Sequence, residues 1–67
     1  MVNTKKLESA IERTGKTKKH LAKQLDMSAP SLYNKINGLS DFSRPEVIVL
    51  AQELNLSEAE RIEILGE

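Results

Sequence analysis

The sequence predicts an all-α fold of five short helices. Helix-capping residues recur along the chain, and the apolar residues between them return every three or four positions. No segment shows the alternation of apolar and polar residues that is typical of a strand, and no internal repeat is present. The 67 residues suffice for one small domain, residues 1–67. A chain of this size buries only about 60% of its unfolded surface, so dimerisation would help to stabilise it.

The first two helices are marked by Asn3 and Thr17, whose side chains can accept hydrogen bonds from the free amides at a helix N-terminus. Gly15 ends the first helix and Asp26 ends the second. The apolar faces expected to point into the core consist of Leu7, Ala10 and Ile11, with Val2 beside them, and of Leu21, Ala22 and Leu25.

The third helix is expected to begin after the cap Ser28 and to end at Gly38. Pro30 lies in its first turn, where a missing N–H has no cost. Leu32 and Ile36 form a narrow apolar stripe, so this side should face the core. At about 100° per residue, the opposite side carries Pro30, Tyr33, Asn34 and Asn37. A helix with so polar an outer face is expected to contact a partner.

Two capping boxes predict the last two helices after a loop at residues 39–42. Ser43 pairs with Glu46 in the first box, and Ser57 pairs with Glu60 in the second. The apolar residues expected on these helices are Val47, Ile48, Leu50, Ala51 and Leu54, and then Ala59, Ile62 and Leu65.

The net charge of zero conceals an asymmetry along the chain. Residues 1–40 carry eight Lys or Arg and three Asp or Glu, which gives +5, whereas residues 41–67 carry two and seven, which gives −5. Such polarity can orient a protein against a polyanion. Ordinary surface charge on helices explains the same pattern, and charge alone does not separate the two interpretations.

Several classes of function are not expected. The chain has no Cys, which excludes disulfides and cysteine metal sites, and His20 is its only His. No nucleophile–base arrangement and no Gly-rich phosphate loop is present. We therefore expect no enzyme, no cofactor and no small-molecule ligand. Because no signal peptide or membrane-spanning stretch is apparent, we expect a cytoplasmic protein without a membrane partner.

The segment TKKHLAKQLDMSAPSLYNKING, residues 17–38, resembles the Cro/repressor family of phage and bacterial transcription regulators. The matching residues are Leu21, Ala22, Leu25, Leu32, Ile36, Asn37 and Gly38, and the spacing of Leu32 and Ile36 is similar to that of the Cro branch. The segment SDFSRPEVIVLAQELNLSEAE resembles the remaining helices of such regulators. The resemblance implies a lambda repressor-like DNA-binding domain, with a helix-turn-helix at about residues 17–37. This chain has Asp26, Lys18 and Leu39 where the family often has Gly, Gln and a basic residue.

The resemblance also implies a DNA-binding site on the third helix, residues 29–37, with further contacts from the segments around it. Contacts to bases are expected from Ser28, Ala29, Pro30, Tyr33, Asn34 and Asn37, and contacts to phosphates from Lys18, Lys19, Lys35, Ser40, Ser43 and Arg44. Asn34 is the main candidate, because Asn can pair with adenine through two hydrogen bonds. Alternatives stay open for these residues: Ser28 only caps the helix, Tyr33 only packs on the second helix, and Asn37 only ends the third. Asn34 and each of the lysines can also be ordinary solvated surface residues.

The function that the resemblance implies is sequence-specific regulation of transcription by a phage or prophage repressor. We expect a homodimer on an inverted-repeat operator, with half-sites about one helical turn of DNA apart. The alternative is a protein-binding modulator of a separate repressor, built on the same fold. The acidic C-terminal half, with Ile62 and Leu65, motivates this alternative.

Overall fold

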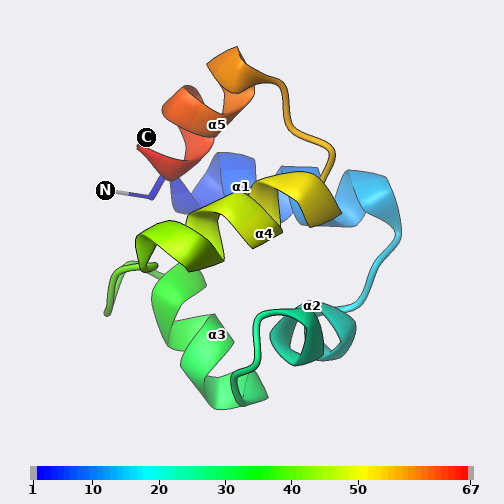
Figure 1. The fold of residues 1–67 in the computed structure, drawn as a ribbon, viewed down its shortest axis with the longest axis vertical. Helices are drawn as coiled ribbons and strands as arrows, with labels where there is room; N and C mark the ends of the chain where they lie inside the picture. Colours follow the sequence, from blue (N-terminus) through cyan, green and yellow to red (C-terminus); the bar gives the residue numbers. More distant parts are fainter. Residues whose placement is uncertain (1, 67) are drawn as a thin grey trace.

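The computed structural model describes residues 2–66, which form five helices and no strand (Figure 1). The helices are α1 (Thr4–Thr14), α2 (Lys18–Gln24), α3 (Ala29–Ile36), α4 (Arg44–Glu53) and α5 (Glu58–Leu65). The predicted all-α class and the predicted number of helices are confirmed.

Each helix begins directly after the residue predicted to cap it. The cap side chains accept hydrogen bonds from amides three residues further along, in the pairs Asn3–Lys6, Thr17–His20, Ser28–Ser31, Ser43–Glu46 and Ser57–Glu60. Both predicted capping boxes are complete, because the Glu46 and Glu60 carboxylates also accept from the Ser43 and Ser57 amides. These bonds satisfy amides that have no partner within the helix, which is why local sequence sets the helix starts.

Left-handed residues follow the first three helices. Gly15 and Gly38 have φ values of +75° and +81°, and Asp26 has φ of +57° in the connection between α2 and α3. Asp tolerates this conformation better than most residues with a side chain, so the tight connection forms without glycine. The predicted ends of α1, α2 and α3 are therefore confirmed to within one or two residues.

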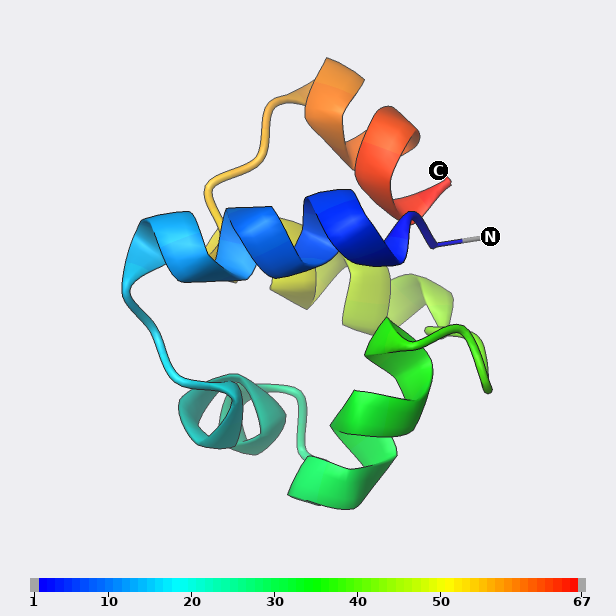
Figure 2. The ribbon, with the colours of Figure 1, turned by 180° about the vertical axis from the view of Figure 1, so that it is seen from behind.

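All five helices contribute to one core. The helices α1 and α4 cross the middle of the molecule, α5 covers one end, and α2 and α3 form the other end (Figures 1 and 2). The buried residues are Leu7, Ala10, Ile11, Leu21, Ala22, Leu25, Leu32, Ile36, Val47, Leu50, Ala51, Leu54, Ile64 and Leu65. Every buried residue in the described part of the chain is apolar, so the polar groups of α3 are left for the surface.

Some of the apolar residues expected on α4 and α5 are not buried. Ile48, Ala59 and Ile62 lie on the surface, where Ile62 is 54% exposed. Ile64 is buried instead, beside Leu65. The reason is the docking of α5 on α1, where the Asn3 amide donates to the Ile64 carbonyl oxygen at 2.8 Å. Because α5 has apolar residues on two sides, only this contact decides which side faces inward.

Candidate nucleic-acid interface

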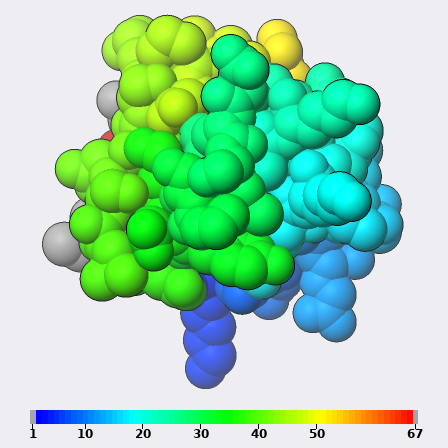
Figure 3. All heavy atoms as spheres, turned by 90° about the horizontal axis from the view of Figure 1, so that it is seen from below, coloured from blue at the N-terminus to red at the C-terminus, as the bar shows by residue number. Residues whose placement is uncertain are grey.

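Helix α3 lies at an open end of the molecule. Viewed from that end, it occupies the centre of the surface, with α2 on one side and the connection to α4 on the other (Figure 3). Leu32 and Ile36 are buried, and the Thr4 hydroxyl donates to the Ile36 carbonyl oxygen at 2.8 Å. These contacts hold the inner side of α3 against the core and leave its outer side exposed.

The outer face of α3 contains the residues that the helical spacing predicts. Pro30, Tyr33, Asn34 and Asn37 are all exposed. Asn34 lies almost opposite the buried stripe, and none of the hydrogen bonds among residues 2–66 involves its side-chain amide. That amide is therefore free to donate one hydrogen bond and accept another from a single partner.

Three predicted base-contact residues are partly engaged within the fold. Ser28 caps α3, because its hydroxyl oxygen accepts from the Ser31 amide at 3.2 Å. Asn37 is the C-cap of α3. Its backbone N–H donates to the Tyr33 carbonyl oxygen at 3.0 Å, and its side chain remains exposed. Ala29 is half-buried in the first turn. Asn37 caps through its backbone, so its side chain stays free. Ser28 caps through its side chain, so one acceptor position of its hydroxyl is occupied.

Lys18 and Tyr33 contact each other between α2 and α3. The Lys18 ammonium nitrogen lies 5.2 Å from the centroid of the Tyr33 ring. The same nitrogen lies 2.9 Å from Oε1 of Glu8, a residue of α1. Lys18, predicted to contact a phosphate, is thus engaged by an acidic side chain and an aromatic ring of its own chain.

Lys35 also makes contacts inside the protein. Its ammonium donates to the Asp41 carbonyl oxygen at 2.7 Å and lies 3.6 Å from Oε1 of Glu46. The Ser43 amide, more than Lys35, holds the pKa of the Glu46 carboxyl below its usual value. Lys35 is only 18% exposed, and it ties the end of α3 to the start of α4. Lys35 therefore holds the connection beside α3 in place, and its charge interacts with Asp41 and Glu46 of the same chain.

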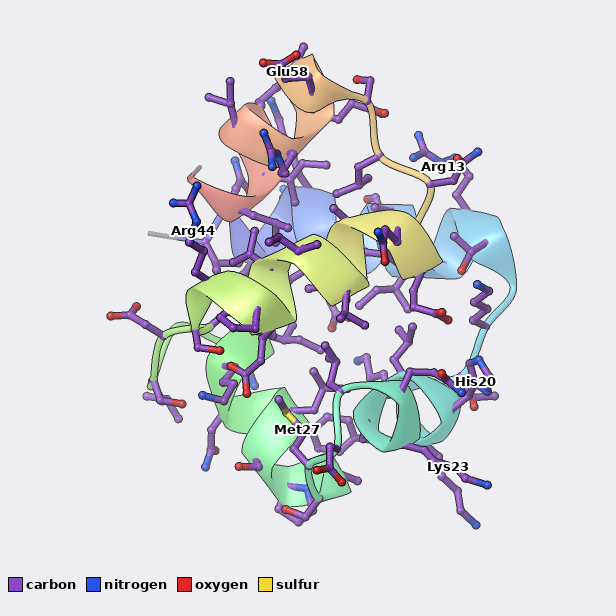
Figure 4. All side chains as sticks on the ribbon, in the orientation of Figure 1. Arg13, His20, Lys23, Met27, Arg44 and Glu58 are labelled. Carbon is purple, nitrogen blue, oxygen red and sulfur yellow. The ribbon has the colours of Figure 1, made fainter. Side chains whose placement is uncertain are left out.

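The other three predicted phosphate contacts beyond α3 are not gathered on one face. The Ser43 hydroxyl oxygen accepts from the Glu46 amide and caps α4, while Ser40 is exposed in the connection. Arg44 extends from the first turn of α4 toward the side of α5, away from the open end of α3 (Figure 4). Arg44 and the outer face of α3 therefore do not form one surface.

Two lysines of α2 border α3. Lys19 and Lys23 line a shallow hollow together with Asp26 before α3 and with Ser28 and Ala29 at its start. Lys23 points outward at the same end of the molecule as this first turn (Figure 4). No acidic side chain of residues 2–66 lies within 4.0 Å of either lysine. Lys23 was not predicted as a site residue, although its spacing of four from Lys19 places both on one side of α2.

Much of the positive charge in the first half of the sequence pairs with acidic side chains of the second half. Four ion pairs join a cation of residues 1–40 to an acid of residues 41–67, namely Lys6–Glu63, Arg13–Glu60, Lys16–Glu53 and Lys35–Glu46. His20 is exposed beside Glu53, with 3.4 Å between Nε2 and Oε1. The cationic charge that remains available beside α3 is that of Lys19 and Lys23.

The chain matches no protein-family model, no curated protein and no solved structure. No helix among the described residues has the length and apolar character needed to cross a membrane. Across residues 2–66, no three His, Cys, Asp or Glu side chains are gathered in a way that could hold a metal ion. The exposed surface around α3 is therefore the feature from which a function can be inferred.

Proposed function

We propose that the chain is a sequence-specific DNA-binding regulator of transcription, with α2 and α3 as the helix-turn-helix of a lambda repressor-like domain. The observation that carries the proposal is the exposed face of α3, with an unengaged Asn34 opposite the buried stripe of Leu32 and Ile36. A free amide on an exposed helix is suited to pairing with the edge of a base.

In this proposal α3 lies in the major groove of double-stranded DNA, which is wide enough to admit a helix. Asn34 pairs with adenine through two hydrogen bonds, while Pro30 and the exposed part of Ala29 pack on the methyl group of a thymine. Asn37 contacts the neighbouring base pair. Lys19 and Lys23 bind phosphates on the α2 side and orient the domain without reading sequence.

Two copies of the chain would bind an inverted repeat whose half-sites are about 34–36 Å apart, or a multiple of that distance. The regulator would act in the cytoplasm of a bacterial host, as expected of a phage or prophage protein. We propose that this domain, five short helices across residues 2–66, represses transcription by occluding the promoter to which it binds.

Selection from a pool of random duplexes, at moderate salt and followed by sequencing, tests the proposal directly. Enrichment of an inverted repeat is the expected result, and the repeat spacing then gives the geometry of the dimer. Enrichment of a single unpaired motif would show that one copy reads DNA alone. If no sequence is enriched, the chain is not a sequence-specific regulator.

A protein-binding modulator of a separate repressor is the second candidate. Two observations favour it: most lysines are paired within the chain, and Ile48 and Ile62 are exposed on α4 and α5. Light scattering after size-exclusion chromatography, combined with a DNA-binding titration at low salt, separates the two functions. A strict monomer that binds no duplex supports the modulator, whereas a dimer that binds an inverted repeat excludes it.

A further inference from the structure

We infer that Lys18 is a positioning residue, which sets the Tyr33 ring on the DNA-reading surface and is itself held by Glu8. This inference rests on the proposed function and deepens it. It gives α1, which contributes no residue to the predicted interface, an indirect part in base preference.

The contacts form a chain across three helices. The Lys18 ammonium donates to Oε2 of Glu8 at 3.0 Å and lies 5.2 Å from the centroid of the Tyr33 ring. A cation over the face of an aromatic ring is attracted by the negative potential of that face. The carboxylate of Glu8 therefore fixes the ammonium from α1, and the ammonium in turn favours one orientation of the ring on α3.

Tyr33 lies where its orientation matters for reading DNA. It directly precedes Asn34 and is 48% exposed on the flank of α3 that faces α2. The phenol hydroxyl can donate or accept a hydrogen bond, so its direction decides which base edge or backbone atom it reaches. Without Lys18 the ring would sample other side-chain rotamers, and the preference at the base pair it contacts would weaken.

A phosphate contact by Lys18 is the competing assignment, and it would require the ammonium to leave both Glu8 and the ring. Lys19 provides a matched control, because it is the next residue and has no acidic partner within 4.0 Å among the described residues. A lysine that binds a phosphate releases a counterion and contributes about 0.9 to the slope of log affinity against log salt. A positioning lysine contributes nothing to that slope.

The experiment compares Lys18→Met, Glu8→Gln and Lys19→Met with the wild-type chain, after thermal melts show that each variant folds. Affinities are measured as a function of salt on the selected duplex and on duplexes changed at single base pairs. For Lys18→Met we expect an unchanged salt slope and a loss of about two- to fivefold in discrimination at one base pair per half-site, the size of an exposed cation–π contact. Glu8→Gln should lose discrimination at the same base pair.

The control should behave in the opposite way. Lys19→Met should lower the slope by about 0.9 per subunit and weaken all duplexes equally. In a Tyr33→Leu background, Lys18→Met should cause no further loss of discrimination, because the two residues act together. If Lys18→Met lowers the slope as Lys19→Met does and keeps full discrimination, Lys18 is a phosphate contact and the inference is wrong.

A measurement on the free protein separates this inference from the proposed function. In the NMR spectrum, the ring current of Tyr33 should move the ε-methylene protons of Lys18 upfield, and Tyr33→Leu should abolish that shift. If the wild-type chain selects a DNA sequence but shows no such shift, only the inference is overturned. If the chain selects no sequence, the proposed function fails, and the role of Lys18 in base preference fails with it.

Discussion

Replacing Asn34 with Ala should change DNA binding and folding in opposite directions. The side chain is exposed within α3, and its amide has no hydrogen-bond partner among residues 2–66. The protein therefore loses no internal hydrogen bond when the amide is removed. Because Ala is the better helix former, the free energy of unfolding should rise by up to about 0.5 kcal/mol.

The expected loss in binding follows from the same geometry. A bidentate pair between Asn and adenine is worth about 1–3 kcal/mol of discrimination, which is about 5- to 150-fold in affinity. A dimer on an inverted repeat makes this contact once per half-site. The loss on the full operator should therefore reach about 2–6 kcal/mol if the half-sites are independent.

Gln52→Ala provides the control, because Gln52 is also an exposed amide on a helix but borders the hollow between α4 and α5. Fluorescence anisotropy on the selected duplex and on duplexes with the adenine replaced measures both affinity and discrimination. Gln52→Ala should bind as the wild type does. If Asn34→Ala retains both affinity and discrimination while Gln52→Ala does the same, Asn34 does not read a base and the proposed docking of α3 is refuted.

Four further results are expected. Leu32→Ala, at a fully buried position, should lower the free energy of unfolding by about 2–5 kcal/mol in urea titrations, and a loss below 1 kcal/mol would contradict the assigned core. Gly38→Ala should cost about 1–2 kcal/mol in the same assay, entirely through its φ of +81°, since an added Cβ would meet no atom within 4 Å. The Ser57 amide, and then Arg13, hold the pKa of Glu60 below its usual 4.5, so this carboxyl stabilises the fold above that pH and loses its effect as the pH falls through its lowered pKa. Thermal melts from pH 7 to 3 should accordingly show a smaller acid-induced fall for Glu60→Gln than for the wild type, and parallel curves would contradict the assignment. Lys23→Ala should reduce the salt slope of DNA binding by about 0.9 per subunit, and an unchanged slope would remove Lys23 from the interface.

The helices could be predicted from the sequence because their determinants are local. A cap such as Ser57 and its partner Glu60 are three residues apart, so the hydrogen bonds that begin a helix are visible in any short window. The outer face of α3 was predictable for the same reason, since Leu32 and Ile36 fix its inner side. The burial of Ile64 instead of Ile62 was not, because it depends on the contact of α5 with α1.

The partner of each charged side chain depends on the tertiary structure. The sequence shows eight cations in residues 1–40, and any of them could face a phosphate. In the fold, Lys6 pairs with Glu63, 57 residues away, and Lys18 is held by Glu8 and Tyr33. An ion pair forms between neighbours in space, and their separation along the chain carries no signal of it. The sequence by itself determined the five helices and the polar face of α3, whereas only the packing of the helices decided that Lys19 and Lys23 keep their charge free beside that face.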